Sequence, residues 1–211
     1  MALNQEEIRS CIEKEYRRRG DTLGWRLLYS PWETMLNADV AFLGLQPGGG
    51  FLPNDHGELC MTSGSAYVTE SWTGRPAGAH PLQKQVRALF DWLDVAPEAV
   101  LAGNLVPFRC PNARSFKDMR GALAFGEWLW RDIVAQARPK LVVTMSRDTT
   151  AAFKRVGGID TLQSRPCGWG SIRLFHGEGP LFRLIGLPHL SRFGIITRPA
   201  SREALLSVLE H

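Results

Sequence analysis

The amino-acid sequence predicts an α/β protein: a three-layer α/β/α fold around a central, mostly parallel four-stranded sheet. Two observations lead to this prediction. Short apolar runs with β-branched residues, typical of buried strands, recur as DVAFLGL (39–45), VLAGNLVPF (100–108), KLVVTM (140–145) and LFRLIGLP (181–188). Segments with helical periodicity lie between these runs. Because strands that alternate with helices pair in parallel, we expect helices on both faces of the sheet.

The first element is an amphipathic helix over residues 4–19, NQEEIRSCIEKEYRRR. Asn4 stands three residues before a glutamate, as in a capping box, and Ile8, Ile12 and Tyr16 follow at helical spacing. The helix ends in three arginines and a glycine. The helix dipole and a glycine C-cap explain this basic last turn, and we favour them over a patch that contacts DNA.

The later elements follow in order. Helical patterns cover residues 80–94, 118–137, 148–155 and 201–210. The run SIRLFH (171–176) and the turn GEGP after it predict a hairpin-type approach to the last main strand. The segment from Gly48 to Ala79 is rich in glycine and polar residues and has no sustained period. Because long loops in compact domains are usually functional or disordered, and this one follows the first strand directly, we interpret it as a site loop.

Composition predicts one domain over residues 1–211, since 44% hydrophobic and 22% charged residues are ordinary for a globular protein of this length. No apolar run reaches the roughly 18 residues of a membrane span, and the charged N-terminus does not resemble a signal peptide. We therefore expect a cytoplasmic, monomeric protein without membrane contact. A net charge of +4 and a pI near 9.1 are compatible with a polyanionic partner.

The cysteines stand far apart, without a CxxC pair, at Cys11, Cys60, Cys110 and Cys167. This spacing favours reduced single thiols over a zinc site or a disulfide scaffold. An iron–sulfur cluster assembled from four scattered cysteines is a less favoured alternative. We expect neither a metal nor a cofactor.

Three of the predicted strands end in unusual sequences: GLQPGGG, GNLVPFR and GLPHLSRFG. The carboxyl ends of parallel strands meet at one edge of the sheet, where open α/β folds bind their ligands. A glycine-rich turn at this edge lets backbone N–H groups approach a phosphate or a planar ligand. Two amides, Gln46 and Asn104, and the His-x-Ser of residues 189–191 are therefore expected to converge there.

In their order and separation, G-L-Q-P-G (44–48), N-L-V-P-F (104–108) and H-L-S (189–191) resemble the uracil-DNA glycosylase superfamily, closest in style to its mismatch-specific and single-strand-selective branches. Its first motif is Gly-x-(Asp/Asn/Glu)-Pro-(Tyr/Gly), its middle strand carries a base-reading asparagine, and its last motif is His/Asn-Pro-Ser. The resemblance extends over roughly residues 25–200. It implies the fold of that superfamily and DNA as the partner.

The resemblance also implies a role for each matching residue. Gln46 would orient the attacking water, Asn104 would read the edge of a flipped pyrimidine, and His189 would stabilise negative charge on the carbonyl oxygen of the leaving base. The DNA-contacting residues would be Gly49, Gly50, Ser191, Arg192 and Phe193, of which the last two are candidates to fill the space left by the extruded base. The flipped base would lie against Gly48, Phe51 and Tyr67, with Trp72 as a further stacking candidate. His56 and His80 are additional candidate site histidines.

The chain departs from the family motifs at three positions. Gln46 replaces Asp, Asn or Glu, and a carboxamide cannot act as a general base; a loop carboxylate from Asp55, Glu58 or Glu70 is the alternative. Gly48 stands where the uracil-selective branch has a tyrosine that excludes the methyl group of thymine, so the pocket is expected to be wider at the pyrimidine 5-position. Leu190 replaces the proline of the last motif, which suggests an altered turn around Ser191.

Two classes of function compete. The first is a monofunctional DNA glycosylase of base excision, which hydrolyses the N-glycosidic bond of a flipped uracil-like or 5-modified pyrimidine in single- or double-stranded DNA. A variant of this class would act on bulky modified cytosines in foreign (phage) DNA. The second is a DNA-binding module that keeps the pocket but has lost catalysis, which Gln46 motivates. A small-molecule hydrolase ranks behind both, because the chain has no Gly-x-Ser-x-Gly elbow.

Overall fold

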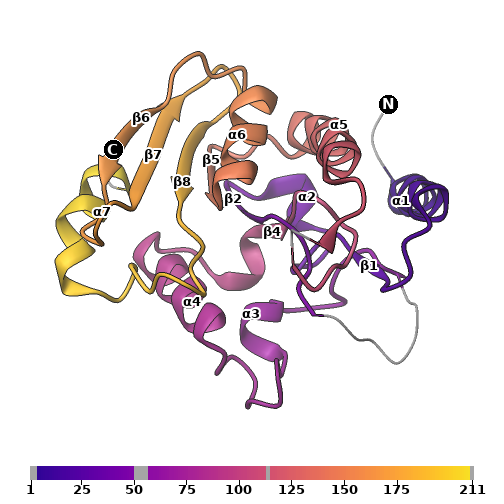
Figure 1. Cartoon of the computed structure of the whole chain (residues 1–211), viewed down its shortest axis with the longest axis horizontal. Coiled ribbons are helices and arrows are strands. Elements are labelled where there is room, and N and C mark those ends of the chain that lie inside the picture. Colours follow the sequence, from indigo (N-terminus) through magenta and orange to yellow (C-terminus); the bar gives the residue numbers. More distant parts are fainter. Residues whose placement is uncertain (1–3, 50–56, 113–114, 210–211) are drawn as a thin grey trace.

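The computed structural model describes residues 4–49, 57–112 and 115–209. Within them, a six-stranded sheet runs in the order β4-β2-β5-β8-β7-β6 (Figure 1). Its strands are β2 (Val40–Gly44), β4 (Leu101–Asn104), β5 (Leu141–Met145), β6 (Gln163–Pro166), β7 (Arg173–Glu178) and β8 (Arg183–Leu187). The expected α/β architecture with a mostly parallel sheet is confirmed.

The predicted number of strands is wrong. The four expected strands pair in parallel in the order β4-β2-β5-β8, but β7 then pairs antiparallel with β8, and β6 pairs antiparallel with β7. The hairpin-type approach to the last main strand is confirmed by the β7–β8 pairing. β6 was missed because its sequence, QSRP, is exposed at every position and so has no buried face that an apolar pattern would reveal.

All five expected helices are present, with boundaries that differ from the prediction by a residue or two. They are α1 (Gln5–Arg19), α4 (Pro81–Trp92), α5 (Met119–Ala137), α6 (Arg147–Val156) and α7 (Arg202–Leu209). The Asn4 side chain accepts a hydrogen bond from the Glu7 N–H at 2.8 Å, and Gly20 closes α1 with a φ of 66°. No helix among the described residues is long and apolar enough to cross a membrane.

Helices cover both faces of the sheet because its buried strands are apolar on both sides (Figure 1). In β2, Ala41 and Leu43 belong to one apolar core together with side chains of α1, α5 and α6. Val40 and Phe42 point to the opposite face and belong to a second core with side chains of α4 and α7. The four parallel strands are therefore held between two helical layers, which fixes the positions of their carboxyl ends.

The predicted site loop contains short regular elements. β1 (Trp25–Arg26) pairs in parallel with β3 (Gly57–Glu58), and α3 (Ala66–Thr69) follows. A Cβ on Gly57 would lie 2.2 Å from atoms of the Trp25 indole, so this pairing requires glycine. Further short helices are α2 (Thr34–Asn37), η1 (Pro97–Ala99) and η3 (Pro199–Ser201). The described part of the segment is thus anchored to residues that precede the first main strand.

Candidate functional site

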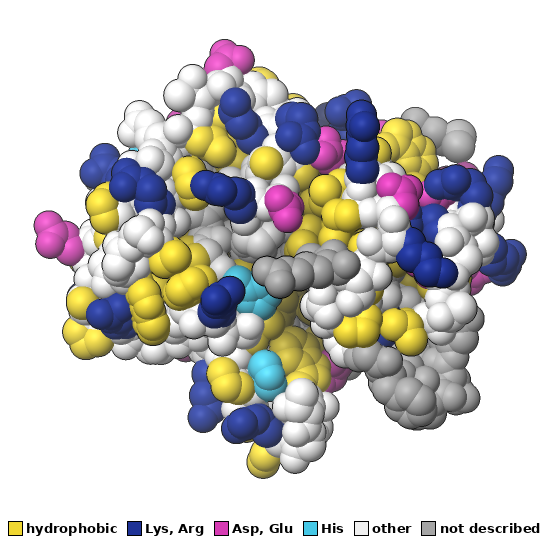
Figure 2. Space-filling model, viewed as in Figure 1, with side chains coloured by type: hydrophobic (Ala, Val, Ile, Leu, Met, Phe, Trp, Pro, Cys, Tyr) yellow, Lys and Arg dark blue, Asp and Glu magenta, His cyan; other side chains and the backbone are white. Residues whose placement is uncertain are grey.

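A cavity of about 730 Å³ lies at the carboxyl ends of the parallel strands. Each of the four strands contributes to its lining: Gln46 follows β2, Asn104 ends β4, Met145 ends β5 and His189 follows β8. Figure 2 shows histidine side chains beside the hollow of the visible face, with Lys and Arg side chains distributed around it. This is the edge at which open α/β sheets bind ligands.

Most of the site residues expected from the sequence line this cavity: Gln46, Gly48, Gly49, Tyr67, Asn104, His189 and Ser191. Glu58, Glu70, Trp72 and His80 line it as well. Arg192 and Phe193 are not among its lining residues. Gly50, Phe51, Asp55 and His56 lie outside the described residues. The site loop, β4 and the turns after β2 and β8 therefore meet around one space.

Asn104 presents an unpaired donor to the cavity. Asn104 is 2% exposed. Its backbone N–H donates to the Leu27 carbonyl at 3.0 Å, and its backbone carbonyl accepts from Trp130 Nε1 at 2.8 Å. A Cβ on Gly44, its partner across β2 and β4, would lie 2.9 Å from Asn104 Oδ1, so glycine there leaves room for the amide. The buried Nδ2 has no partner within ordinary hydrogen-bond geometry among the described residues, and the Tyr29 phenol is the polar group of the cavity with which this amide interacts. A ligand carbonyl oxygen would satisfy it.

Gln46 presents the complementary group, an acceptor. Its Nε2 donates to the Cys110 carbonyl at 3.0 Å, which fixes the orientation of the amide. Its Oε1 is buried and has no partner within the described part of the chain. An unpaired buried carbonyl oxygen can accept a hydrogen bond from a water molecule or a ligand hydroxyl.

The glycine turn after Gln46 leaves open space. A Cβ on Gly48 would meet no atom of the described residues within 4 Å, whereas Gly49 has a φ of 95°, which L side chains rarely adopt. The Gly48 carbonyl accepts a hydrogen bond from Arg109 Nη1. Gly48 is therefore a position where the cavity is wide, and Gly49 is required by the backbone.

His189 is neutral at neutral pH. Desolvation of its imidazole, and after it the positive charge of Arg192, lower the pKa of His189 from its ordinary value. Its Nδ1 lies 2.8 Å from Ser191 Oγ. When the serine hydroxyl donates to Nδ1, Nε2 carries the ring proton and is a donor. With this direction of the hydrogen bond, Ser191 would hold His189 in the tautomer that carries its proton on Nε2.

Aromatic rings form one side of the cavity, which we call the aromatic wall: Tyr29, Tyr67 and Trp72. Tyr67 is 1% exposed, and its ring centroid lies 5.5 Å from those of Tyr29 and Trp72, in edge-to-face geometry. Burial raises the pKa of Tyr67 well above its ordinary value, so its hydroxyl stays protonated. Such a wall is suited to a planar, partly apolar ligand.

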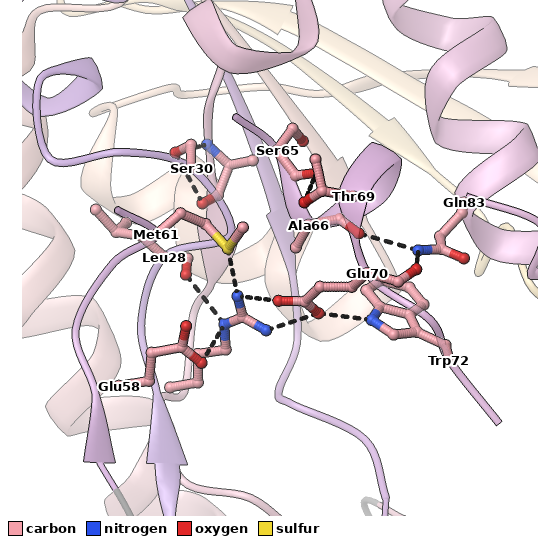
Figure 3. Close-up of polar contacts among 12 residues, drawn as sticks. Leu28, Ser30, Glu58, Met61, Ser65, Ala66, Thr69, Glu70, Trp72 and Gln83 are labelled. Carbon is pink, nitrogen blue, oxygen red and sulfur yellow. Dashed lines mark hydrogen bonds and ion pairs between the residues drawn. The ribbon is translucent and has the colours of Figure 1, made fainter. Parts of the chain in front are cut away.

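A partly buried ion-pair network, centred on the buried Arg26, supports this wall (Figure 3). Arg26, which is 5% exposed, donates from Nη1 and Nη2 to the two oxygens of Glu70 at 3.0 and 2.7 Å. Its Nε lies 3.1 Å from a carboxylate oxygen of Glu58. Trp72 Nε1 donates to Glu70 Oε2 at 2.7 Å. Glu70 thus connects the arginine to the indole of the aromatic wall.

Glu70 is ionised at neutral pH, but its oxygens are already occupied. Burial raises the pKa of Glu70, yet the hydrogen bond and charge of Arg26, with contributions from Trp72 and Arg109, outweigh burial and leave the pKa below its ordinary value. Glu58 is also paired with Arg26. Among the described residues, both loop carboxylates that line the cavity are therefore engaged with one arginine.

The sequence patterns do not single out Arg26, Tyr29 or Arg109, although all three line the cavity. Arg26 and Tyr29 lie before the first motif, in a segment without strong periodicity. Arg109 follows the N-L-V-P-F motif directly, and this adjacency was the signal available for it. Its Nε is buried without a partner among the described residues, as are Gln46 Oε1 and Asn104 Nδ2.

Arg192 and Phe193 extend the turn that carries His189. The N–H groups of both residues donate to the His189 carbonyl at 2.9 Å. The Phe193 ring lies edge-on to Trp169 with a centroid distance of 5.8 Å, and the Arg192 guanidinium lies 5.7 Å from the Phe193 centroid. His80 caps α4, since its Nδ1 accepts from the Leu82 N–H at 3.2 Å.

The cysteines are free thiols, and the described residues contain no group of three or more His, Cys, Asp or Glu side chains arranged to hold a metal ion. The four cysteines, all of them described, therefore do not gather into a cluster site. Comparison of the chain with protein-family models and with curated protein sequences finds no match.

Proposed function

We propose that this protein is a monofunctional DNA glycosylase that hydrolyses the N-glycosidic bond of a flipped uracil-like or 5-modified pyrimidine. The observation that carries the proposal is Asn104, a buried amide whose Nδ2 lacks a partner and which lines the same cavity as Gln46 and His189. Leaving a buried donor unpaired costs about 1–3 kcal/mol, which a bound ligand would recover. The order of the three motifs supports the same proposal.

The base is recognised by the Asn104 amide and the aromatic wall. A pyrimidine that presents a carbonyl oxygen beside a ring N–H matches an amide that offers a donor and an acceptor on one edge. The rings of Tyr29, Tyr67 and Trp72 supply apolar contact for its planar face. An extruded nucleotide then replaces its stacking in DNA with contacts in the cavity.

His189 stabilises the leaving base. As the glycosidic bond breaks, its electron pair moves to the base and negative charge develops on the base carbonyl oxygen. A neutral imidazole with the proton on Nε2 donates a hydrogen bond to that oxygen without any change of protonation state. Ser191 holds the tautomer that makes this possible.

Gln46 positions the water that adds to the sugar. Its Oε1 accepts a hydrogen bond from the water, and its Nε2 is held by the Cys110 carbonyl, so the acceptor is fixed in place. An amide takes no proton at neutral pH, and its contribution is therefore orientation rather than base catalysis. The water proton passes to solvent or to the departing base.

A second candidate is a DNA-binding module without catalysis. It is favoured by Glu58 and Glu70, because both carboxylates of the described cavity are bound to Arg26 and Gln46 is no base. A glycosylase for bulky modified cytosines in foreign (phage) DNA is favoured by the open space at Gly48. The candidate functions differ in whether an abasic product forms and in which base is released.

The deciding experiment is single-turnover base release. Oligonucleotides that carry uracil, 5-hydroxymethyluracil or a glucosylated cytosine are incubated with excess protein in single- and double-stranded form, and abasic sites are cleaved by alkali and counted. Asn104→Ala and His189→Ala should suppress the product. Asn37→Ala and His176→Ala are matched controls, since neither residue lines the cavity.

Product that both cavity variants suppress, and that both controls retain, supports the glycosylase and names its base. Retained DNA binding with no product from any oligonucleotide would favour the binding module. Product only from the glucosylated cytosine would favour the variant specific for bulky bases.

A further inference from the structure

We propose that Arg109 forms a phosphate-binding subsite inside the cavity, which holds a phosphate group of the extruded nucleotide. This inference rests on the proposed function, because it names how the same cavity grips the nucleotide outside its base. No motif of the sequence assigns a role to this arginine. Its position, its lack of an ion-pair partner among the described residues and its neighbours each support the assignment.

Arg109 is held in place at the glycine turn. Its backbone N–H donates to the Gly24 carbonyl at 3.0 Å, and its Nη1 donates to the Gly48 carbonyl. The next residue, Cys110, accepts from Gln46 Nε2. The guanidinium and the Gln46 amide are therefore tied to the same turn, and both line the cavity.

The charge of Arg109 is not neutralised by an ion pair within the described residues. The contrast is with Arg26 in the same cavity, which is paired with both Glu58 and Glu70. The Glu70 oxygens accept from Arg26 and Trp72, and the charge of Arg109 helps to lower the pKa of Glu70 without forming an ion pair with it among the described residues. Meanwhile Arg109 Nε is buried with no acceptor. A partly buried guanidinium with an unpaired N–H is costly unless an anion binds to it.

A phosphate group is the anion that best fits the end of the cavity beside the Arg109 guanidinium. The Arg fork matches two phosphate oxygens and forms short, charge-assisted hydrogen bonds with them. Asn104 and the aromatic wall provide the contacts for a base, whereas the Arg109 guanidinium is hydrogen-bonded to the turn that carries Gln46, the residue proposed to act at the sugar. A phosphate attached to that sugar is the anionic group of a nucleotide nearest to this end of the cavity.

The test compares a nucleoside with its monophosphates. Deoxyuridine, deoxyuridine 5′-monophosphate and deoxyuridine 3′-monophosphate are titrated into the ¹⁵N-labelled full chain, and dissociation constants are taken from amide chemical shifts. At least one monophosphate should bind about 10-fold more tightly than deoxyuridine, the effect of about one charge-assisted hydrogen bond. Arg109→Gln should remove this preference and leave the affinity for deoxyuridine within about twofold of the wild type.

Three further variants make the comparison specific. Asn104→Ala should weaken all three probes by a similar factor and so keep the preference for phosphate. Arg109→Lys, which keeps the charge but loses the fork, should keep part of the preference. Arg17→Gln, an exposed arginine of α1 that does not line the cavity, should bind like the wild type.

The proposal is overturned if the wild type shows no preference for either monophosphate, if the preference survives Arg109→Gln, or if none of the probes binds at millimolar concentration. Equal weakening of deoxyuridine and its monophosphates by Arg109→Gln would also overturn it, since Arg109 would then contact the base. Failure of the proposed function is distinguishable: an Arg109-dependent preference without any abasic product would keep the subsite and discard the glycosylase.

Discussion

The absence of a side chain at Gly44 leaves space for the Asn104 amide. A substitution at Gly44 can therefore test the role of this amide without a large change in the stability of the protein. In Gly44→Ala the new Cβ would lie 2.9 Å from Asn104 Oδ1 and 3.6 Å from Met145 Cε. Both are side-chain atoms that can shift, so we expect a displaced amide in an intact fold. Single-turnover base release should fall about 10²-fold, the usual effect of a misplacement of about 1 Å. The midpoint temperature of thermal unfolding should change by no more than about 4 °C.

Gly48→Ala is the matched control for this substitution. Its Cβ would meet no atom within 4 Å in the part of the chain that the structure describes, so neither the described fold nor the Asn104 amide should be disturbed. The methyl group instead narrows the cavity, and release of a large 5-substituted base should fall more than release of uracil. Equal activity of Gly44→Ala and the wild type would show that the position of Asn104 does not limit the reaction.

The pKa of His189 is a second property that a single residue controls. Desolvation lowers it first and the Arg192 charge second, so the neutral form should persist below the ordinary histidine pKa of about 6.5. NMR titration of the imidazole should show that protonation occurs only as the pH falls below that value. Arg192→Gln should raise the pKa of His189 without restoring the ordinary value, because desolvation remains.

His176 on β7 serves as the internal reference in the same titration. Its pKa is lowered by desolvation and then by Arg165 and Arg183, so it should not respond to Arg192→Gln. A His189 that titrates at or above the ordinary value in the wild type would contradict the neutral donor on which the leaving-group step depends.

At the scale of elements, Arg26 joins β1 to β3 and to the segment between α3 and α4. Arg26→Met keeps an apolar side chain of similar length but leaves Glu58 and Glu70 without their partner. We expect a loss of about 2 kcal/mol in the free energy of unfolding at pH 7, less than for a fully buried ion pair because the side chains of Glu58 and Glu70 are 34% and 28% exposed. Urea denaturation followed by tryptophan fluorescence measures this loss, since Trp72 lies at the network.

The contribution of Glu70 should depend on pH in one direction. Because its pKa is lowered in the folded protein, its stabilising effect is complete above the ordinary pKa of about 4.3 and is lost as the pH falls through the lowered value. The difference in the free energy of unfolding between the wild type and Glu70→Gln should therefore shrink from pH 6 to pH 3. Glu13→Gln, in an exposed pair on α1, should show little difference at either pH.

How far the sequence predicts these elements depends on whether they bury an apolar face. The four parallel strands and five helices do, and their patterns place them within a few residues. β6 is exposed, and the β1–β3 pair is two residues long on each side, so neither carries a periodic signal. In the cavity, Gln46, Asn104 and His189 were visible through motif order, whereas the Arg26 network joins residues 32 and 44 positions apart, which no local pattern reports.

At the scale of the whole molecule, the two cores share one sheet. Ala41 and Val40 are neighbours in β2 yet belong to opposite cores, so loss of packing on one face removes support from the other. The chain should consequently unfold as one cooperative unit, as expected for a single domain. Urea unfolding measured by far-UV circular dichroism and by tryptophan fluorescence should give coincident curves.

Matched substitutions in the two cores test this coupling. Phe153 of α6 and Phe90 of α4 are both fully buried, one in each core. Phe153→Leu and Phe90→Leu should each lower the free energy of unfolding by about 1 kcal/mol, as conservative core changes do. Each should shift the whole transition, because the carboxyl ends that carry Gln46, Asn104 and His189 are held from both faces. A variant that splits the curve into two steps would mean that the faces unfold separately, and the cavity would then depend on one helical layer rather than on the complete sandwich.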